Sequence, residues 1–139
     1  MSSQTVKGET LQFTNDNLHC YAYSGNIPLN NEQKTFLSFK SPNNSYIDAN
    51  FFITGNIAFI GSSKWIKFDL DFDGLAIMSA SHIAASAQGF NDIDGYKVII
   101  PPATEVILKI QTNDTGSLDY QAVLTGKVGM PQRVGNLDD

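Results

Sequence analysis

A strict alternation of apolar and polar residues between Lys64 and Phe72 restricts the possible folds of this chain more than any other feature. Large apolar side chains occupy every second position of this segment, at Ile66, Phe68, Leu70 and Phe72. The positions between them hold Trp65, Lys67, Asp69 and Asp71. A period of two matches a β-strand, in which successive side chains point to opposite faces. The segment therefore predicts a strand with one buried face, which needs a second layer to pack on.

The same period recurs in the C-terminal third of the chain. Between Thr104 and Gln111 the apolar face is expected to consist of Thr104, Val106, Leu108 and Ile110. In the segment from Leu118 to Lys127, Ala122 and Leu124 are expected to point inward. Runs of β-branched and aromatic residues bounded by turn residues predict further strands. These lie at Leu18–Ser24, Lys34–Lys40, Tyr46–Asp48, Phe51–Ile60, Leu75–Met78 and Tyr96–Ile100.

Two segments allow more than one interpretation. Gly55-Asn56 fits either a β-bulge or a hairpin turn inside the strand predicted over Phe51–Ile60. The segment from Ser79 to Gln88 is rich in Ala and small polar residues, and it fits either a short helix or a strand followed by a loop. We favour the strand and loop, because serine hydroxyls offer the backbone local hydrogen bonds that compete with a helix.

The residues between the predicted strands favour turns. Only three of the fourteen acidic residues are glutamates, and the others are aspartates, which prefer turns and caps to helix interiors. The sequence therefore predicts an all-β fold: a single antiparallel β-sandwich, jelly-roll-like, with about eight strands. A length of 139 residues fits one domain. We expect the sandwich over residues 11–128, between a flexible arm over 1–10 and a loose tail over 129–139.

Charge and cysteine content exclude some classes of function. Nine basic and fourteen acidic residues give a net charge of −5, whereas binding to a phosphate backbone rewards Lys and Arg, so we expect no nucleic-acid partner. No apolar stretch is long enough to span a bilayer, and we expect no membrane partner. The one cysteine, Cys20, cannot form an intrachain disulfide, and its apolar surroundings predict a buried thiol.

One local motif resembles a metal site. Asp69-Leu70-Asp71-Phe72-Asp73-Gly74 matches the opening of a calcium-binding loop, which makes Asp69, Asp71 and Asp73 the candidate metal ligands. That loop also needs a glutamate at its twelfth position, where this chain has Ala80. The strand alternation already accounts for the first two aspartates, and Asp73-Gly74 is a favoured hairpin turn. We therefore expect no metal and no other cofactor.

No catalytic set is found in the sequence. Asn91-Asp92-Ile93-Asp94-Gly95 is expected to be a polar loop that ends in an Asp-Gly turn. His82 lies near Ser79 and Ser81, but the chain contains no Gly-x-Ser-x-Gly elbow, and the histidine is expected on a loop or at the surface. We therefore predict that the protein is not an enzyme.

Three apolar residues fall on strand faces that are otherwise polar. They are Trp65, Ile107 and Val123. Apolar side chains on such faces are typical of surfaces that another subunit covers. We therefore predict that all three lie at an interface and that the chain forms a homo-oligomer.

Several segments resemble a known group of proteins. They are His19–Ile27, Thr35–Phe39, Ser45–Ile47, Tyr96–Val106 and Tyr120–Val128. Their Tyr-Ser-Gly turn, asparagine-rich turn and closing strands are similar to those of small jelly-roll virion proteins, the capsid decoration or auxiliary proteins of marine tailed bacteriophages. The resemblance covers about half of the domain, and the segment from Lys64 to Gly95 departs from it. It implies a non-enzymatic role on the capsid or tail, and symmetric oligomers among which a trimer is favoured.

Two functions follow as hypotheses. The first is a virion structural protein that is made in the host cytoplasm and decorates or cements the capsid through contacts with the major capsid protein or other virion proteins. The alternative is a carbohydrate-binding module, lectin-like or serving host adhesion, in which Trp65 with Tyr21, Tyr23 or Tyr46 would stack on sugars.

Overall fold

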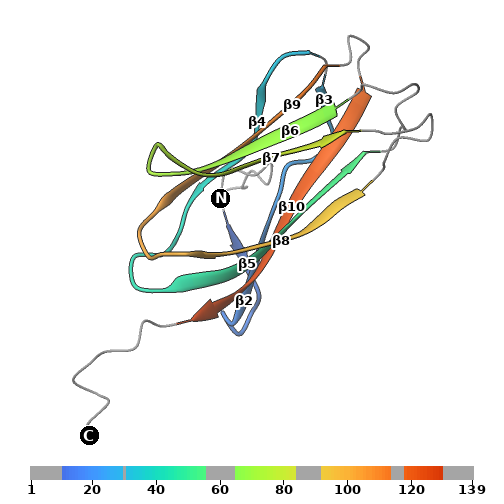
Figure 1. Ribbon diagram of the computed structural model, residues 1–139. Coiled ribbons are helices and arrows are strands. Elements are labelled where there is room, and N and C mark those ends of the chain that lie inside the picture. The colour runs from blue at the N-terminus through green and yellow to red at the C-terminus, as the bar shows by residue number, and fades with distance from the viewer. Residues whose placement is uncertain (1–10, 30, 56–64, 84–91, 114–117, 130–139) are drawn as a thin grey trace, which may run out of the picture.

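The computed structural model describes residues 11–29, 31–55, 65–83, 92–113 and 118–129. These residues form strands joined by turns, arranged as two facing sheets (Figure 1). The strands are β1 (Gln12–Phe13), β2 (His19–Tyr23), β3 (Ile27–Leu29), β4 (Lys34–Lys40), β5 (Tyr46–Gly55), β6 (Trp65–Phe72), β7 (Leu75–Ile83), β8 (Asp92–Ile100), β9 (Glu105–Thr112) and β10 (Leu118–Gly129). Within the described ranges, no helix has the length and hydropathy needed to cross a membrane.

The strand order identifies the sandwich as a jelly roll. One sheet has the order β1-β2-β10-β5-β8, with β3 also paired to β10, and the other has the order β4-β9-β6-β7. All pairs are antiparallel, and the eight long strands pair as nested hairpins: β2 with β10, β4 with β9, β5 with β8 and β6 with β7. This nesting of first with last strand, folded over into two sheets, is the jelly-roll arrangement. The predicted all-β sandwich is confirmed.

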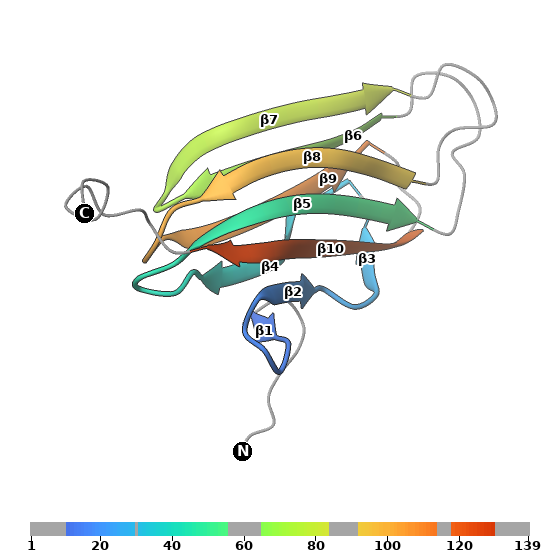
Figure 2. The same ribbon diagram turned by 90° about the horizontal axis from the view of Figure 1, so that it is seen from below.

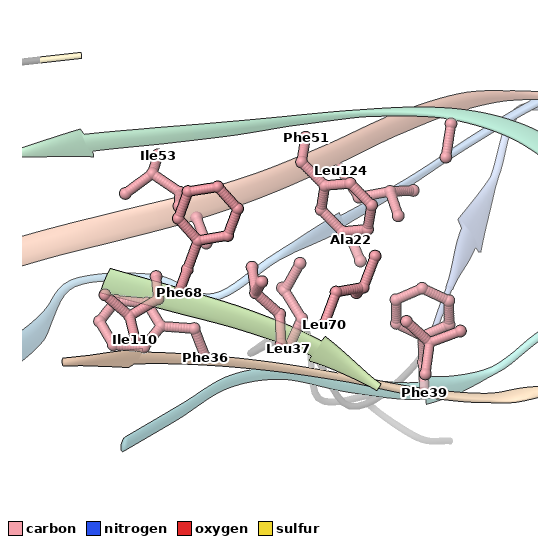
Figure 3. Packing of buried hydrophobic residues seen from close by; sticks show 14 of the residues in the cluster. Ala22, Phe36, Leu37, Phe39, Phe51, Ile53, Phe68, Leu70, Ile110 and Leu124 are labelled. Atoms are coloured by element: carbon pink, nitrogen blue, oxygen red, sulfur yellow. The ribbon is translucent and has the colours of Figure 1, made fainter. Parts of the chain in front are cut away.

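The core lies between the two sheets and is built from the alternating residues of each strand (Figure 3). In β6, Ile66, Phe68 and Leu70 are almost fully buried, as the alternation predicts. The predicted inward residues of β9 and β10, and Thr104 directly before β9, are buried as well: Thr104, Val106, Leu108, Ile110, Ala122 and Leu124. The strand register derived from the sequence is therefore correct for these three strands.

Two predicted elements differ from the structure. The separate strands expected at Tyr46–Asp48 and Phe51–Ile60 are one ten-residue strand, β5, which places Ile47, Ala49, Phe51 and Ile53 in the core. Small Ala49 on the inward face and apolar Phe52 on the outward face hide this alternation in the sequence. Residues 56–60 lie outside the described residues, and so does the predicted loop after Ile83. The strand expected from Leu75 continues to Ile83, in agreement with the favoured interpretation of Ser79 onward.

The segment Asn91–Gly95 is not a polar loop with an Asp-Gly turn where the structure describes it. Strand β8 begins at Asp92, and Gly95 lies inside it. Phe51 pairs with Tyr96 and Ile53 with Ile93, so that one residue of β5 faces Asp94 and Gly95 together. The glycine therefore marks a β-bulge rather than a turn. Asn91 lies outside the described residues.

Residues at the two ends of the chain were expected to form the arm and the tail. Residues 1–10 and 130–139 lie outside the described residues, so these two assignments stay predictions. Strand β10 ends at Gly129, one residue beyond the predicted end of the sandwich.

Phe68 offers a direct test of this register. Its ring is 1% exposed and packs edge-on against Tyr96 of the other sheet, with 4.7 Å between ring centroids. We expect Phe68→Ala to lower the free energy of unfolding by about 3–5 kcal/mol, measured by urea denaturation. Phe13→Ala is the control, because Phe13 is 41% exposed and its loss should change stability by about 0.5 kcal/mol or less. Equal effects of the two substitutions would contradict the register.

Candidate functional site

The three predicted interface residues do not lie on one surface. Trp65 and Ile107 are on the outer face of the β4-β9-β6-β7 sheet, whereas Val123 is on the outer face of the opposite sheet. Within the first sheet, Ile107 pairs with Asp71, six positions along β6 from Trp65. All three side chains are half-buried. Their role in an interface stays a prediction, but one contact surface cannot contain all three.

The three aspartates of the calcium-like motif each have another partner. Asp69 accepts hydrogen bonds from Ser79 Oγ at 2.6 Å and from Gln33 Nε2 at 3.0 Å. Asp71 faces Lys109 across the sheet, with 3.5 Å between Oδ2 and Nζ. Asp73 accepts a hydrogen bond from the Glu105 backbone N–H at 2.8 Å, which ties the β6–β7 turn to the start of β9. Among the residues that the structure describes, no group of three or more His, Cys, Asp or Glu side chains is placed to hold a metal ion.

Cys20 lies in the core, where β2 faces the opposite sheet. Its side chain is 3% exposed, and burial raises the pKa of its thiol to about 11. A thiol with a raised pKa is a poor nucleophile at neutral pH. The structure thus places Cys20 as the sequence predicts, among the buried hydrophobes.

A groove of about 460 Å³ crosses the outer face of the β1-β2-β10-β5-β8 sheet. Two rows of cross-strand neighbours form it. The lining of the first row is Thr125, Asn50 and Lys97, with Tyr21 next to Thr125 but outside the lining, and that of the second row is His19, Lys127 and Asp48. Because neighbouring strands lie about 4.8 Å apart, the groove spans about 14 Å from β2 to β8. We call this surface the outer groove.

The outer groove combines hydrogen-bonding groups with positive charge. Lys97 and Lys127 face a single carboxylate, that of Asp48, in a chain whose overall net charge is −5. The amide oxygen of Asn50 is buried, and no hydrogen-bond partner for it is found in the described part of the chain. Tyr21 and Tyr23 stand beside these groups, 43% and 40% exposed. Exposed rings next to fixed polar groups are the components of a site for polar ligands with an apolar face.

The sequence predicts Tyr21 and Tyr23 as sugar-stacking residues, whereas the polar side chains beside them carry no recognisable signal of a site. The polar groups of the outer groove come from four strands that are distant in sequence. In the sequence, each of these polar residues can be recognised only as an outward position of its own strand. Tyr46 and Trp65 are not part of the groove, and the Trp65 carbonyl oxygen accepts a hydrogen bond from Thr112 Oγ1 at 2.8 Å.

A second hollow, of about 430 Å³, lies at the end of the sandwich beside the β1–β2 turn. Its wall is mostly apolar and includes Phe13, Leu18, Pro42 and Val128. Phe13 is 41% exposed and Leu18 is 56% exposed. We call this surface the apolar hollow. Exposed apolar side chains gathered in a concave surface are typical of protein–protein contacts.

Comparison with known proteins gives similarity of structure only. No family model matches the sequence, and no curated protein matches it. The structure is similar to the infectious bursal disease virus VP2 subviral particle, with 17% identity and a TM-score of 0.44 over 75% of this chain and 29% of the viral chain. A structure of the Gx strain of that virus gives 16% identity and a TM-score of 0.43, over 83% and 34% of the two chains.

The chain thus spans about a third of the length of the viral chains that it matches. Similarity at this level concerns the arrangement of strands and carries no information on activity or partners.

The raised pKa of Cys20 predicts a pH dependence of stability. The folded state holds the thiol proton more tightly than the unfolded state, so the stabilisation is complete below pH 9 and is lost as the pH rises toward 11. The loss should reach about 2–3 kcal/mol by pH 11. Urea denaturation of the parent and of Cys20→Ala between pH 8 and pH 11 measures it. We expect the difference between the two to shrink as the pH rises, and a constant difference would contradict this explanation.

Proposed function

We propose that this chain is a structural protein of a tailed-bacteriophage virion, which decorates or cements the capsid through contacts with the major capsid protein or other virion proteins. The observation that carries the proposal is the apolar hollow, where Phe13 and Leu18 remain exposed. The resemblance of the strand and turn segments to small virion proteins supports the same role. The chain would be made in the host cytoplasm and would reside in the particle.

The proposed action is mechanical rather than chemical. A protein that binds assembled capsid subunits better than free ones stabilises the assembly by mass action. Burial of an exposed leucine contributes about 1.5–3 kcal/mol, and a particle presents many equivalent sites. Leu18 is 56% exposed and is not part of the core, so it can be buried against another protein without changing the packing of the core.

Purified particles test this proposal. Quantitative mass spectrometry should find the chain in stoichiometric amounts relative to the major capsid protein, and Leu18→Asp should reduce its occupancy about tenfold or more. Ile99→Asp is a matched control, because Ile99 is 53% exposed and lies outside the apolar hollow. Absence of the chain from the particle would refute the virion role. Equal occupancy of parent and Leu18→Asp would refute the apolar hollow as the contact.

The outer groove favours a second candidate function, the binding of acidic carbohydrates. Two lysines in the groove and the two exposed tyrosines beside it can bind a carboxylate or sulfate and a sugar ring face respectively. Such a site would serve adhesion to a host surface. It does not exclude a place on the virion.

Calorimetric titration with alginate oligosaccharides, polysialic acid and heparin tests this candidate, with neutral dextran as the reference glycan. We expect at least one acidic glycan to bind, and Lys97→Gln to weaken its binding about tenfold, because a charge-assisted hydrogen bond is lost. Lys40→Gln is the control, since Lys40 is exposed at the end of β4 and does not line the groove. Binding of none of the three acidic glycans, or equal weakening by both substitutions, would contradict a site in the groove.

A further inference from the structure

The edges of the two sheets differ in how they are protected from pairing with another chain. Unpaired edge strands invite such pairing, and proteins usually block it with short strands, charges, proline or bulges. Strands β1 and β3 are two and three residues long. Strand β4 begins and ends with lysine, and β8 carries Lys97 and the bulge at Gly95.

Strand β7 has much less protection. It runs for nine residues at the edge of its sheet, and its sequence, LAIMSASHI, contains no Lys, Arg, Asp, Glu or Pro. Its one irregularity is a bulge at Ile77, where Leu70 pairs with Met78 and Asp71 with Ala76. Leu75 is 67% exposed and Ile77 is 45% exposed. A long, uncharged edge with exposed aliphatic side chains is a template for β-pairing.

The core is also open along the same side of the sandwich. Strands β7 and β8 form neighbouring edges there (Figure 2). Their inward residues that pack on the core are only partly buried: Met78, Ala80, Tyr96 and Val98. On the opposite side, the corresponding residues of β4 and β2 are at most 4% exposed: Phe36, Leu37, Phe39, Cys20 and Ala22. The interior is therefore covered along the β4 and β2 side and partly exposed along the β7 and β8 side.

We propose that a second copy of this chain pairs with β7, antiparallel and around a two-fold axis, to give one continuous sheet of eight strands. The occupant is a second copy because the free edge is uncharged: two molecules that each carry a net charge of −5 can approach there without opposing like charges. A two-fold axis presents the same edge twice, which closes the assembly and leaves no edge of this kind free. This inference concerns the isolated chain and does not rest on the proposed virion role.

Two matched substitutions test the pairing. Ser81 on β7 and Thr35 on β4 are exposed hydroxyl residues, one on each edge of the same sheet. Ser81 lies opposite Lys67, and Thr35 lies opposite Lys109. A glutamate at either position gains the same cross-strand partner, so both variants should fold with a melting temperature close to that of the parent. Only Ser81→Glu places two new negative charges along the paired edges.

Light scattering coupled to size exclusion at tens of micromolar gives the result. We expect the parent and Thr35→Glu to have twice the chain mass of 15.2 kDa, and Ser81→Glu to dissociate with a dissociation constant at least about tenfold higher. A parent that is monomeric or trimeric, or a dimer that Ser81→Glu leaves intact, would overturn the proposal.

Amide hydrogen exchange on the unaltered chain gives a second measurement that does not depend on a variant. Amides of β7 should gain protection as the protein concentration is raised through the dissociation constant, and those of β4 should not. Equal behaviour of the two edges would also overturn the pairing. A chain that is monomeric in solution but present on particles would end this proposal and leave the virion role standing.

Discussion

The position of β10 is the constraint on which the rest of the structure depends. This last strand lies between β2 and β5, so that the first and last long strands of the chain are neighbours and both neighbours of β10 come from the N-terminal half of the chain. Pairings between distant segments require loop closure before they contribute stability. The packing on the inward side of β10 also restricts which residue type can stand at Gly126. A Cβ atom on Gly126 would lie 2.5 Å from Ile47 Cγ2, so only glycine lets β2 and β5 approach this strand as they do.

Much of the fold follows from alternation, and the exceptions have local causes. The registers of β6, β9 and β10 are predictable because apolar inward residues alternate with mostly polar outward ones, with Trp65, Ile107 and Val123 as the exceptions. In β4, Phe36 and Leu37 are adjacent and both buried, because a bulge between Thr35 and Leu37 turns both inward. Asp94-Gly95 has the composition of a turn, yet the pairing with β5 holds it inside β8. A bulge and a turn use the same residues, and only the partner strand distinguishes them.

The surface sites depend on which strands are neighbours, and alternation does not supply that information. Trp65, Ile107 and Val123 are outward residues of three strands, but the strand order puts them on two opposite faces. The polar side chains of the outer groove become neighbours only because β2, β10, β5 and β8 are adjacent in space. A pattern read along one strand gives the face of each residue. The assembly of a site from four strands requires the topology of the whole chain.

The two sheets of the sandwich carry different surfaces, and this separation bears on how the proposed roles combine. The outer groove lies on the outer face of one sheet, and the β7 edge belongs to the other sheet. Pairing through β7 would therefore extend its own sheet sideways and leave the outer groove of each copy uncovered. A dimer built this way carries two grooves held in a fixed relation by a continuous sheet. Two weak sites joined rigidly bind a repetitive polysaccharide more tightly than either alone, because the second contact forms at a high effective concentration. The edge that lacks charged residues and the groove that concentrates them are thus compatible features of one molecule.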